Sequence, residues 1–221
     1  MSAAGPPQGA NCAPTGGSEA AKPQAWGSMS PIGPPAGLET TASQTVGPYL
    51  HIGLTWLVTD DLVGPGTSGE PIVVEGRITD ADGKPVDDAL IEIWQANAHG
   101  RYDHPDDTRD LPLEPGFKGF GRVPTDAGGA FRFRTIKPGA VPAADGSMQA
   151  PHINVTIFMR GMLKHLATRL YFPDEPANAI DPVLARVPVE RRDTLIAKAG
   201  GDALQWNIVL QGAGETVFFE Y

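Results

Sequence analysis

The sequence predicts an all-β protein, an antiparallel β-sandwich with one short helix and long loops. Short segments in which apolar and polar residues alternate recur along the chain, and this period of two is typical of half-buried strands. The 221 residues include 27 Gly and 22 Pro, which fall mainly between these segments, where turns are needed. Only residues 188–200 have helix signals, a proline at the start and a glycine at the end, with an apolar side of Leu195, Ile196 and Ala199.

The first 40 residues differ from the rest of the chain. They are rich in Gly, Pro, Ala and Ser and show no hydrophobic periodicity, which is the composition of a segment that stays disordered on its own. We therefore predict a disordered extension over residues 1–40, followed by one β-sandwich domain over residues 41–221.

Two hairpins are predicted in the first half of this domain, over residues 71–97 and 120–136. In the first hairpin, the second strand directs Ala89, Ile91 and Ile93 to one face and Leu90, Glu92 and Trp94 to the other. In the second hairpin, Phe131 and Phe133 alternate with arginines. Later strands are predicted over residues 152–161, 165–172, 203–211 and 215–221, and the Pro-rich residues 173–182 are predicted to form a loop.

Composition limits the function. The formal net charge is −9 and the pI about 4.9, which argues against nucleic acid or an anionic membrane as a partner because both require a basic patch. A small anionic substrate held by one arginine stays compatible with this charge. A single cysteine, Cys12, allows no intrachain disulfide. We found neither an apolar run of about 18 residues nor a signal-peptide pattern, so we expect a cytoplasmic protein.

Three residues could belong to a metal site, although Asn154 is a poor substitute for the second histidine of a His-x-His pair. His152 and Asn154 lie two apart on a predicted strand and therefore face the same side, and Tyr102 follows a turn at a strand end. Tyrosinate and imidazole together suit ferric iron. The alternatives are that Tyr102 is a half-buried tyrosine with a local acceptor, that a backbone carbonyl binds His152, and that Asn154 is a hydrogen-bonded strand residue.

Each of the other polar residues noted in the sequence has two possible roles. Arg160, at the end of the strand that begins at His152, is either a carboxylate clamp or a solvated arginine. We expect Arg160 to lie near the rim of the His152 site. His165 and Arg169 share one face of a strand, as core-edge or interface residues. No nucleotide-binding, serine-hydrolase or zinc-protease motif is found.

Seven sequence motifs resemble, in order, those of the intradiol ring-cleavage dioxygenase family. They are ETTASQTVGPYLHIGL, IEIWQANAHGRY, GFGR–TD–FRTIKPG, APHIN, HLATRLYF, RRDTLIAK and GETVFF, and they run from about Thr41 to the end of the chain. Within the family they are similar to the α-subunits of the protocatechuate 3,4-dioxygenases, and the resemblance implies a β-sandwich fold.

The resemblance also implies where iron binds. The family's catalytic β-subunits hold non-haem Fe(III) with two tyrosines and two histidines. Tyr102 and His152 match one ligand of each type, but Val141 and Asn154 stand at the other two positions. The resemblance therefore implies a degenerate site in this chain, with Fe(III) bound by the partner β-subunit.

The α-subunits of this family complete the substrate site of the β-subunit. Carried over by motif, the substrate contacts are Thr45, Val46, Gly47, Pro48 and Arg160. The resemblance implies a multimeric αβ assembly that cleaves 3,4-dihydroxybenzoate with O₂ to 3-carboxy-cis,cis-muconate, in the catabolism of aromatic compounds. Two alternatives stay open: a self-sufficient intradiol dioxygenase with substituted ligands, and a non-enzymatic assembly module.

Overall fold

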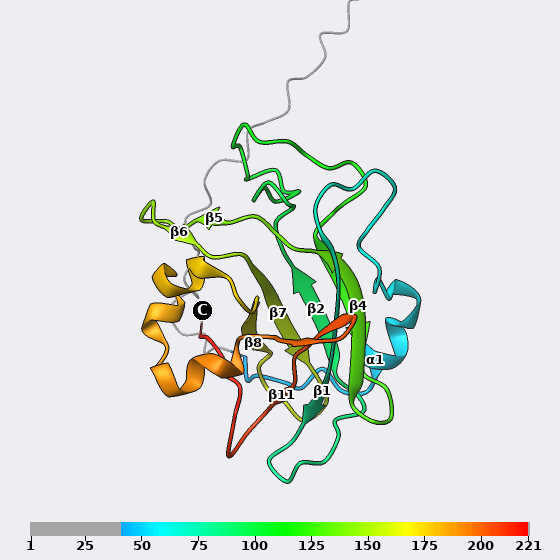
Figure 1. Ribbon diagram of the computed structural model, residues 1–221. Coiled ribbons are helices and arrows are strands. Elements are labelled where there is room, and N and C mark those ends of the chain that lie inside the picture. Colours follow the sequence, from blue (N-terminus) through cyan, green and yellow to red (C-terminus); the bar gives the residue numbers. More distant parts are fainter. Residues whose placement is uncertain (1–40, 221) are drawn as a thin grey trace, which may run out of the picture. The chain divides into compact units, whose positions relative to one another are not determined.

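Two β-sheets pack face to face in the computed structural model, which describes residues 41–220 (Figure 1). The prediction of an all-β fold is confirmed: most elements are strands, and the described residues contain one short α-helix. The predicted extension over residues 1–40 lies outside the described residues.

The first sheet has four antiparallel strands in the order β3-β2-β7-β8. These strands are β2 (Leu90–Trp94), β3 (Phe120–Pro124), β7 (His152–Phe158) and β8 (Leu166–Tyr171). In the register, Asn154 lies between Trp94 of β2 and Arg169 of β8. This row of three residues lies on the face of the sheet that points away from the core.

The second sheet is built around β1 (Pro71–Thr79), which is paired on both sides. On one side it pairs antiparallel with β4 (Ala130–Ile136). On the other side it pairs parallel with β10 (Ala203–Gln205) and then with β11 (Ile208–Val209). The strand β9 (Lys198–Gly200) pairs antiparallel with β10. A separate ribbon joins β5 (Val141–Pro142) to β6 (Met148–Gln149).

The core fills the space between the two sheets. The alternation that the sequence shows for Ile91 and Ile93 and for Phe131 and Phe133 places these side chains on the inward face of their strands. The fully buried side chains of this core include Val74, Ile78, Ile91, Ile93, Ile153, Ile157, Leu170 and Ile208. The opposite faces of β2 and β7 are less buried, and they carry Glu92, Trp94 and Asn154.

Two predictions about local pairing are wrong. The strands of residues 71–79 and 90–94 belong to different sheets, and so do those of residues 120–124 and 130–136. The connection between β3 and β4 is a tight turn in which the Gly129 amide donates to the Asp126 carbonyl, yet it passes from one sheet to the other. Alternation defines which way a side chain points but not which strand lies beside it.

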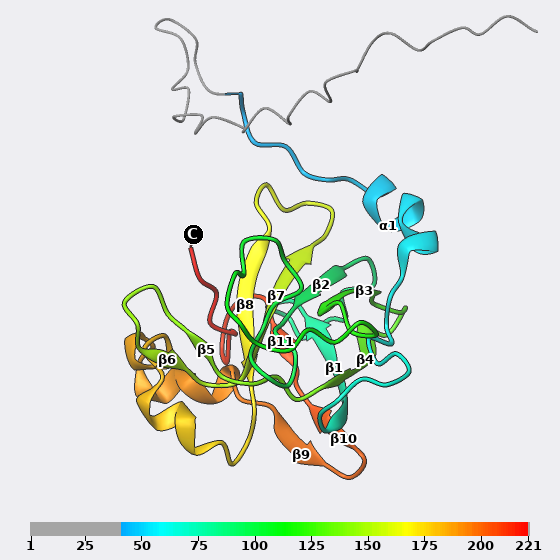
Figure 2. The same ribbon diagram turned by 90° about the horizontal axis from the view of Figure 1, so that it is seen from above.

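The helical segments are short and lie at the periphery. On one side are α1 (Tyr49–Gly53) and the 3-10 turn η1 (Thr55–Leu57). On the other, beside β8, are the 3-10 turns η2 (Pro176–Ile180), η3 (Leu184–Arg186) and η4 (Val189–Thr194), drawn in yellow and orange in Figures 1 and 2. Among the described residues, no helix has the length and apolar character needed to cross a membrane.

The predicted helix over residues 188–200 is only partly correct. Residues 189–194 are a 3-10 helix, whereas residues 198–200 form β9. The chain leaves the helix because Leu195 and Ala197 pair with the end of β8: the Tyr171 amide donates to the Leu195 carbonyl at 2.8 Å, and the Ala197 amide donates to the Tyr171 carbonyl at 3.0 Å. Tertiary hydrogen bonds therefore override the local helix signals.

Candidate functional site

The residues matched to metal ligands gather on the outer face of the four-stranded sheet. His152 and Asn154 point to this face because the alternate residues of β7, Ile153 and Val155, fill the core. His152 lies opposite Tyr171 of β8, and their rings are 5.8 Å apart. The prediction that His152 and Asn154 share one face is confirmed.

Tyr102 reaches the same face from the loop after β2. Its ring stacks on Trp94 with centroids 5.5 Å apart, and the nearby Asn154 side chain acts to lower the pKa of its hydroxyl. The Asp107 carboxylate holds this loop by accepting hydrogen bonds from the Tyr102 amide at 2.8 Å and from Arg109 Nε at 2.8 Å. The hydrogen bonds from Arg109 keep the pKa of the Asp107 carboxyl well below its usual range.

Val141 completes the set of four positions. The loop of Tyr102 lies against the segment before Val141 because Gly100 has φ 77° and a Cβ there would lie 2.2 Å from the Ala140 carbonyl oxygen. Val141 and Tyr102 line one surface hollow of about 540 Å³, together with Trp94, His104, Asp106, Asp107, Thr108, Arg109 and Pro142. All four positions are therefore neighbours.

Burial controls the protonation of the site. It lowers the pKa of His152 to about 4, so the imidazole is neutral at pH 7. Its Nδ1 lies 2.7 Å from the Ala150 carbonyl oxygen, which can only accept, so Nδ1 carries the proton. Burial also raises the pKa of Tyr102 above its ordinary value, although the positive charge of Arg169 acts in the opposite direction. At pH 7 both groups are uncharged.

These residues do not fit the ferric ligand set of the resemblance. Val141 is buried and has no donor atom, and Asn154 offers an amide in place of an imidazole. Within residues 41–220, no group of three or more His, Cys, Asp or Glu side chains is placed to hold a metal ion. Two of four ligands remain, and Tyr102, the only phenol at the matched positions, is neutral.

Sequence reasoning missed two residues of this site, Tyr171 and Asp181, and did not connect Arg169 with it. Arg169 Nη1 donates to Gln149 Oε1 at 2.7 Å and lies 3.5 Å from the Tyr171 hydroxyl. That hydroxyl donates to Asp181 Oδ1 at 3.2 Å. Asp181 is 1% exposed and also accepts hydrogen bonds from the amides of Ala150, Val183 and Leu184. Only the β8 register could have shown that Arg169 faces Asn154.

Arg160 lies elsewhere, and the expectation that it lies at the rim of the His152 site is wrong. His152 begins β7 and Arg160 follows its end, so the strand alone separates them by about 20 Å at ~3.3 Å per residue. Arg160 Nε is 2.7 Å from Asp88 Oδ2, and Nη2 is 3.6 Å from Asp87 Oδ1. Its side chain is 60% exposed, whereas that of Asp88 is 16% exposed. Asp88 therefore holds the Nε edge of the guanidinium and leaves the rest accessible.

The predicted loop contacts do come together with Arg160. The Gly161 amide donates to Thr45 Oγ1 at 2.8 Å, which attaches the loop to the turn that carries Arg160. Gly47 has φ 66°, a conformation that favours glycine, and Pro48 directly precedes α1. We call this group, made of Thr45, Asp87, Asp88, Arg160 and Gly161, the Arg160 corner.

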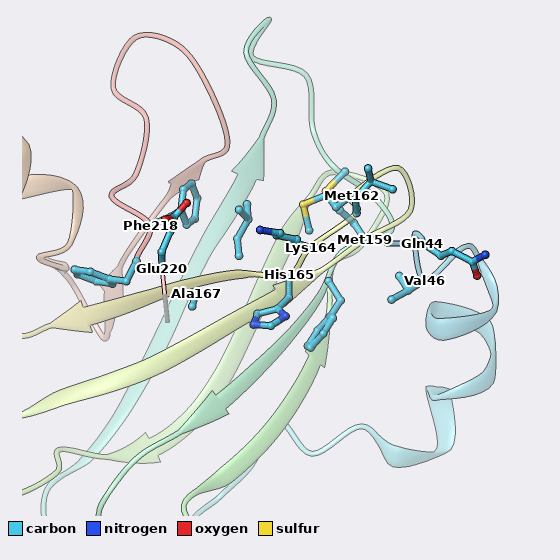
Figure 3. Close-up of a pocket in the computed structure, with 13 residues that line it drawn as sticks. Gln44, Val46, Met159, Met162, Lys164, His165, Ala167, Phe218 and Glu220 are labelled. Carbon is cyan, nitrogen blue, oxygen red and sulfur yellow. The ribbon is translucent and has the colours of Figure 1, made fainter. Parts of the chain in front are cut away.

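An apolar pocket adjoins the Arg160 corner. It has a volume of about 600 Å³. Figure 3 shows Val46 and Gln44 on one side of Met159 and Met162, and Phe218 and Glu220 on the opposite side. The His165 ring lies 5.7 Å from that of Phe158. Beyond the loop, Tyr49, Ile52 and Trp56 are 81%, 63% and 77% exposed. Large apolar side chains exposed this far, next to an anchored loop, are typical of an interaction surface.

Comparisons with known proteins agree with this architecture. Residues 57–212 match the family described as Dioxygenase. The chain is 43% identical over 200 residues to the protocatechuate 3,4-dioxygenase alpha chain of Burkholderia cepacia, covering 83% of this chain and 98% of the relative. It is 44% identical over 158 residues to the beta chain from the same organism, covering 67% of each. Among solved structures, the dioxygenase domain of a dioxygenase carbohydrate-binding protein fusion from Streptomyces sp. SirexAA-E has a TM-score of 0.54 and 29% identity, covering 79% of this chain and all of that one.

Proposed function

Because this chain belongs to the intradiol dioxygenase family, we propose that it is the α-type subunit of a two-chain protocatechuate 3,4-dioxygenase and does not itself hold the iron. The observation that carries this proposal is the pair of missing donors at Val141 and Asn154, in a chain that aligns over 98% of an alpha-chain relative but only 67% of a beta-chain relative.

The iron of the holoenzyme is then a property of a β-type partner. When bound there, Fe(III) supplies the activation of the catechol toward O₂. The role of this chain is to bind and orient the substrate and to exclude water from it. Its own residues can do this without a metal.

A surface suited to such a partner is continuous with the Arg160 corner. The anchored Thr45 loop leads into α1 and then η1, where the exposed Tyr49 of α1 and Trp56 of η1 offer apolar area to a second chain. Large aromatic side chains are enriched at the centres of protein interfaces. Docking over this surface would also remove water from Arg160.

Arg160 is the residue proposed to select the substrate. A guanidinium has five donors in a fixed plane and pairs well with a carboxylate. Asp88 binds its Nε edge, so the Nη groups can receive the carboxylate of 3,4-dihydroxybenzoate. Thr45, Val46, Gly47 and Pro48 would form the wall beside the ring.

The proposed reaction inserts both atoms of one O₂ molecule between the two hydroxyl-bearing ring carbons. The bond between these carbons breaks, and the product is 3-carboxy-cis,cis-muconate, which contains all atoms of substrate and oxygen.

Reconstitution tests the proposal. The chain is expressed alone and together with a β-type chain, and iron per chain, visible colour and O₂ consumption are measured. We expect iron and activity only in the co-expressed complex. Iron and colour in this chain alone would support a self-sufficient enzyme, and neither property in any pairing would support an assembly module.

A matched pair of variants tests the surface. Trp56→Ser should abolish co-purification, because Trp56 is 77% exposed on the proposed interface. Ile180→Ser is the control, since Ile180 is 78% exposed at the end of η2, on the opposite side of the domain (Figure 1). Equal effects of the two variants would contradict the assigned surface.

A further inference from the structure

The four positions matched to metal ligands, Tyr102, Val141, His152 and Asn154, have an arginine among them. We call these residues together with Arg169 the remnant cluster, and the loss of two ligands does not explain why it contains a cation. Arg169 lies directly across from Asn154 in the β7–β8 register, and His152 lies across from Tyr171 in the next pair on the same face. A guanidinium is permanently charged. It therefore adds a positive charge to the face that would hold a ferric ion in a metal-binding relative.

Arg169 contacts the surroundings of the other positions as well. Its Nη1 donates to Gln149, which pairs with Val141 across the β5–β6 ribbon. The same atom is 3.5 Å from the hydroxyl of Tyr171, the partner of His152. The charge of Arg169 also acts on Tyr102 and on His152. The guanidinium is therefore linked to all four positions matched to ligands.

We propose that Arg169 is the resident cation of this cluster, that it organises the polar side chains which a metal organises in other members of the family, and that it excludes a ferric ion. Like charges repel strongly at short range in a poorly solvated site. Restoring the two missing donors would thus not restore metal binding while Arg169 remains. This inference does not depend on a partner chain.

Ligand grafting on the full chain tests the exclusion. The double variant Val141→Tyr with Asn154→His is compared with two triple variants that add Arg169→Leu or Arg169→Lys. Each folded protein is incubated with ferric citrate, and iron per chain and visible ferric-tyrosinate absorbance are measured. Because the repulsion is removed only in the leucine form, we expect it to take up at least about tenfold more iron than the other two.

The matched control adds Arg122→Leu to the double variant. Arg122 is another arginine of the same sheet, paired with Glu92 on β2 and remote from the β7–β8 pair. Adding Arg122→Leu should leave iron uptake at the level of the double variant. Iron binding by the double variant with Arg169 in place would overturn the proposal, as would no gain in a folded leucine triple variant.

A second measurement needs no grafted ligand and covers the case in which the triple variants do not fold. In the otherwise unchanged chain, Arg169→Lys keeps the cation and Arg169→Met removes it while keeping an unbranched side chain. If the cluster needs a cation, the methionine form should melt at least about 4 °C below the lysine form. Equal melting temperatures would show that the charge is not required and would refute the resident-cation role.

Discussion

Replacing Arg160 by alanine should impair the use of a carboxylated catechol while leaving the fold nearly intact. The guanidinium is 60% exposed, and its ion pairs are with Asp88 and the exposed Asp87. The exposed pair with Asp87 contributes about 0–1 kcal/mol to stability, whereas Asp88 is only 16% exposed and would lose its cation, so the free energy of unfolding should fall by about 1–3 kcal/mol. Loss of a charge-assisted hydrogen bond to the substrate costs about 1.5–3 kcal/mol, or roughly 10- to 150-fold in kcat/KM.

The assay is steady-state O₂ consumption by the co-expressed complex, with 3,4-dihydroxybenzoate and with catechol, which has no carboxylate. Arg160→Ala should reduce kcat/KM for the first substrate far more than for the second. Arg160→Lys should recover part of the loss, since a lysine keeps the charge but not the planar fork. Arg132→Ala is the control, because Arg132 is 64% exposed and ion-paired with Glu75 in the other sheet.

Three outcomes would separate the possible roles of Arg160. A loss confined to the carboxylated substrate supports the clamp. Equal losses for both substrates would mean that Arg160 shapes the interface or assists a step common to both, and the clamp would be refuted. No loss for either substrate would make it a solvated surface arginine.

Further expectations concern the loop, the acid stability and the buried network. Thr45→Val removes the acceptor of the Gly161 amide and should raise KM with little change in the unfolding free energy; an unchanged KM would exclude the loop from the substrate site. The pKa of His152 is about 4 in the folded state and about 6.5 when unfolded, so the unfolded state binds more protons in between and stability falls as pH falls from 6.5 to 4. In urea titrations at several pH values, His152→Gln should lack up to about 3 kcal/mol of this fall, and an identical pH profile would contradict the assignment. Asp181→Ala should lower the unfolding free energy by about 3–5 kcal/mol because it leaves several buried donors without their acceptor; a loss below about 1 kcal/mol in urea unfolding would contradict this role.

The facing of side chains could be predicted from the sequence, but strand partners could not. Alternation alone predicts that Ile91 and Ile93 share one face of their strand, and the structure places that face in the core. Both predicted hairpins failed since consecutive strands pass to opposite sheets. The helix ended early at Thr194 because hydrogen bonds with Tyr171 compete with it, and no local pattern reports such a competitor.

The sequence could predict those parts of the candidate site whose residues lie together in one short motif. His152 and Asn154 lie two residues apart, so their shared face follows from strand geometry. The sequence places Arg160 correctly at the end of the strand that begins at His152, but the length of β7 separates it from the His152 site. The sequence predicts Arg169 only as a core-edge or interface residue and gives Asp181, in a Pro-rich loop, no role. Their contacts arise only from the pairing of β8 and the return of the chain beside it.

The position of β1 between β4 and the C-terminal strands has a consequence for how the protein is made. The Arg77 amide donates to Asn207 Oδ1 at 3.0 Å, across 130 residues of chain. While the ribosome is still synthesising that distant segment, β1 can already pair with β4, but its other edge has unpaired amides and carbonyls. Such an edge is a template for pairing with other chains, and contacts so remote in sequence form slowly. A nascent chain that stalls before residue 203 is therefore the form of this protein most exposed to aggregation, and the form a chaperone would have to shield.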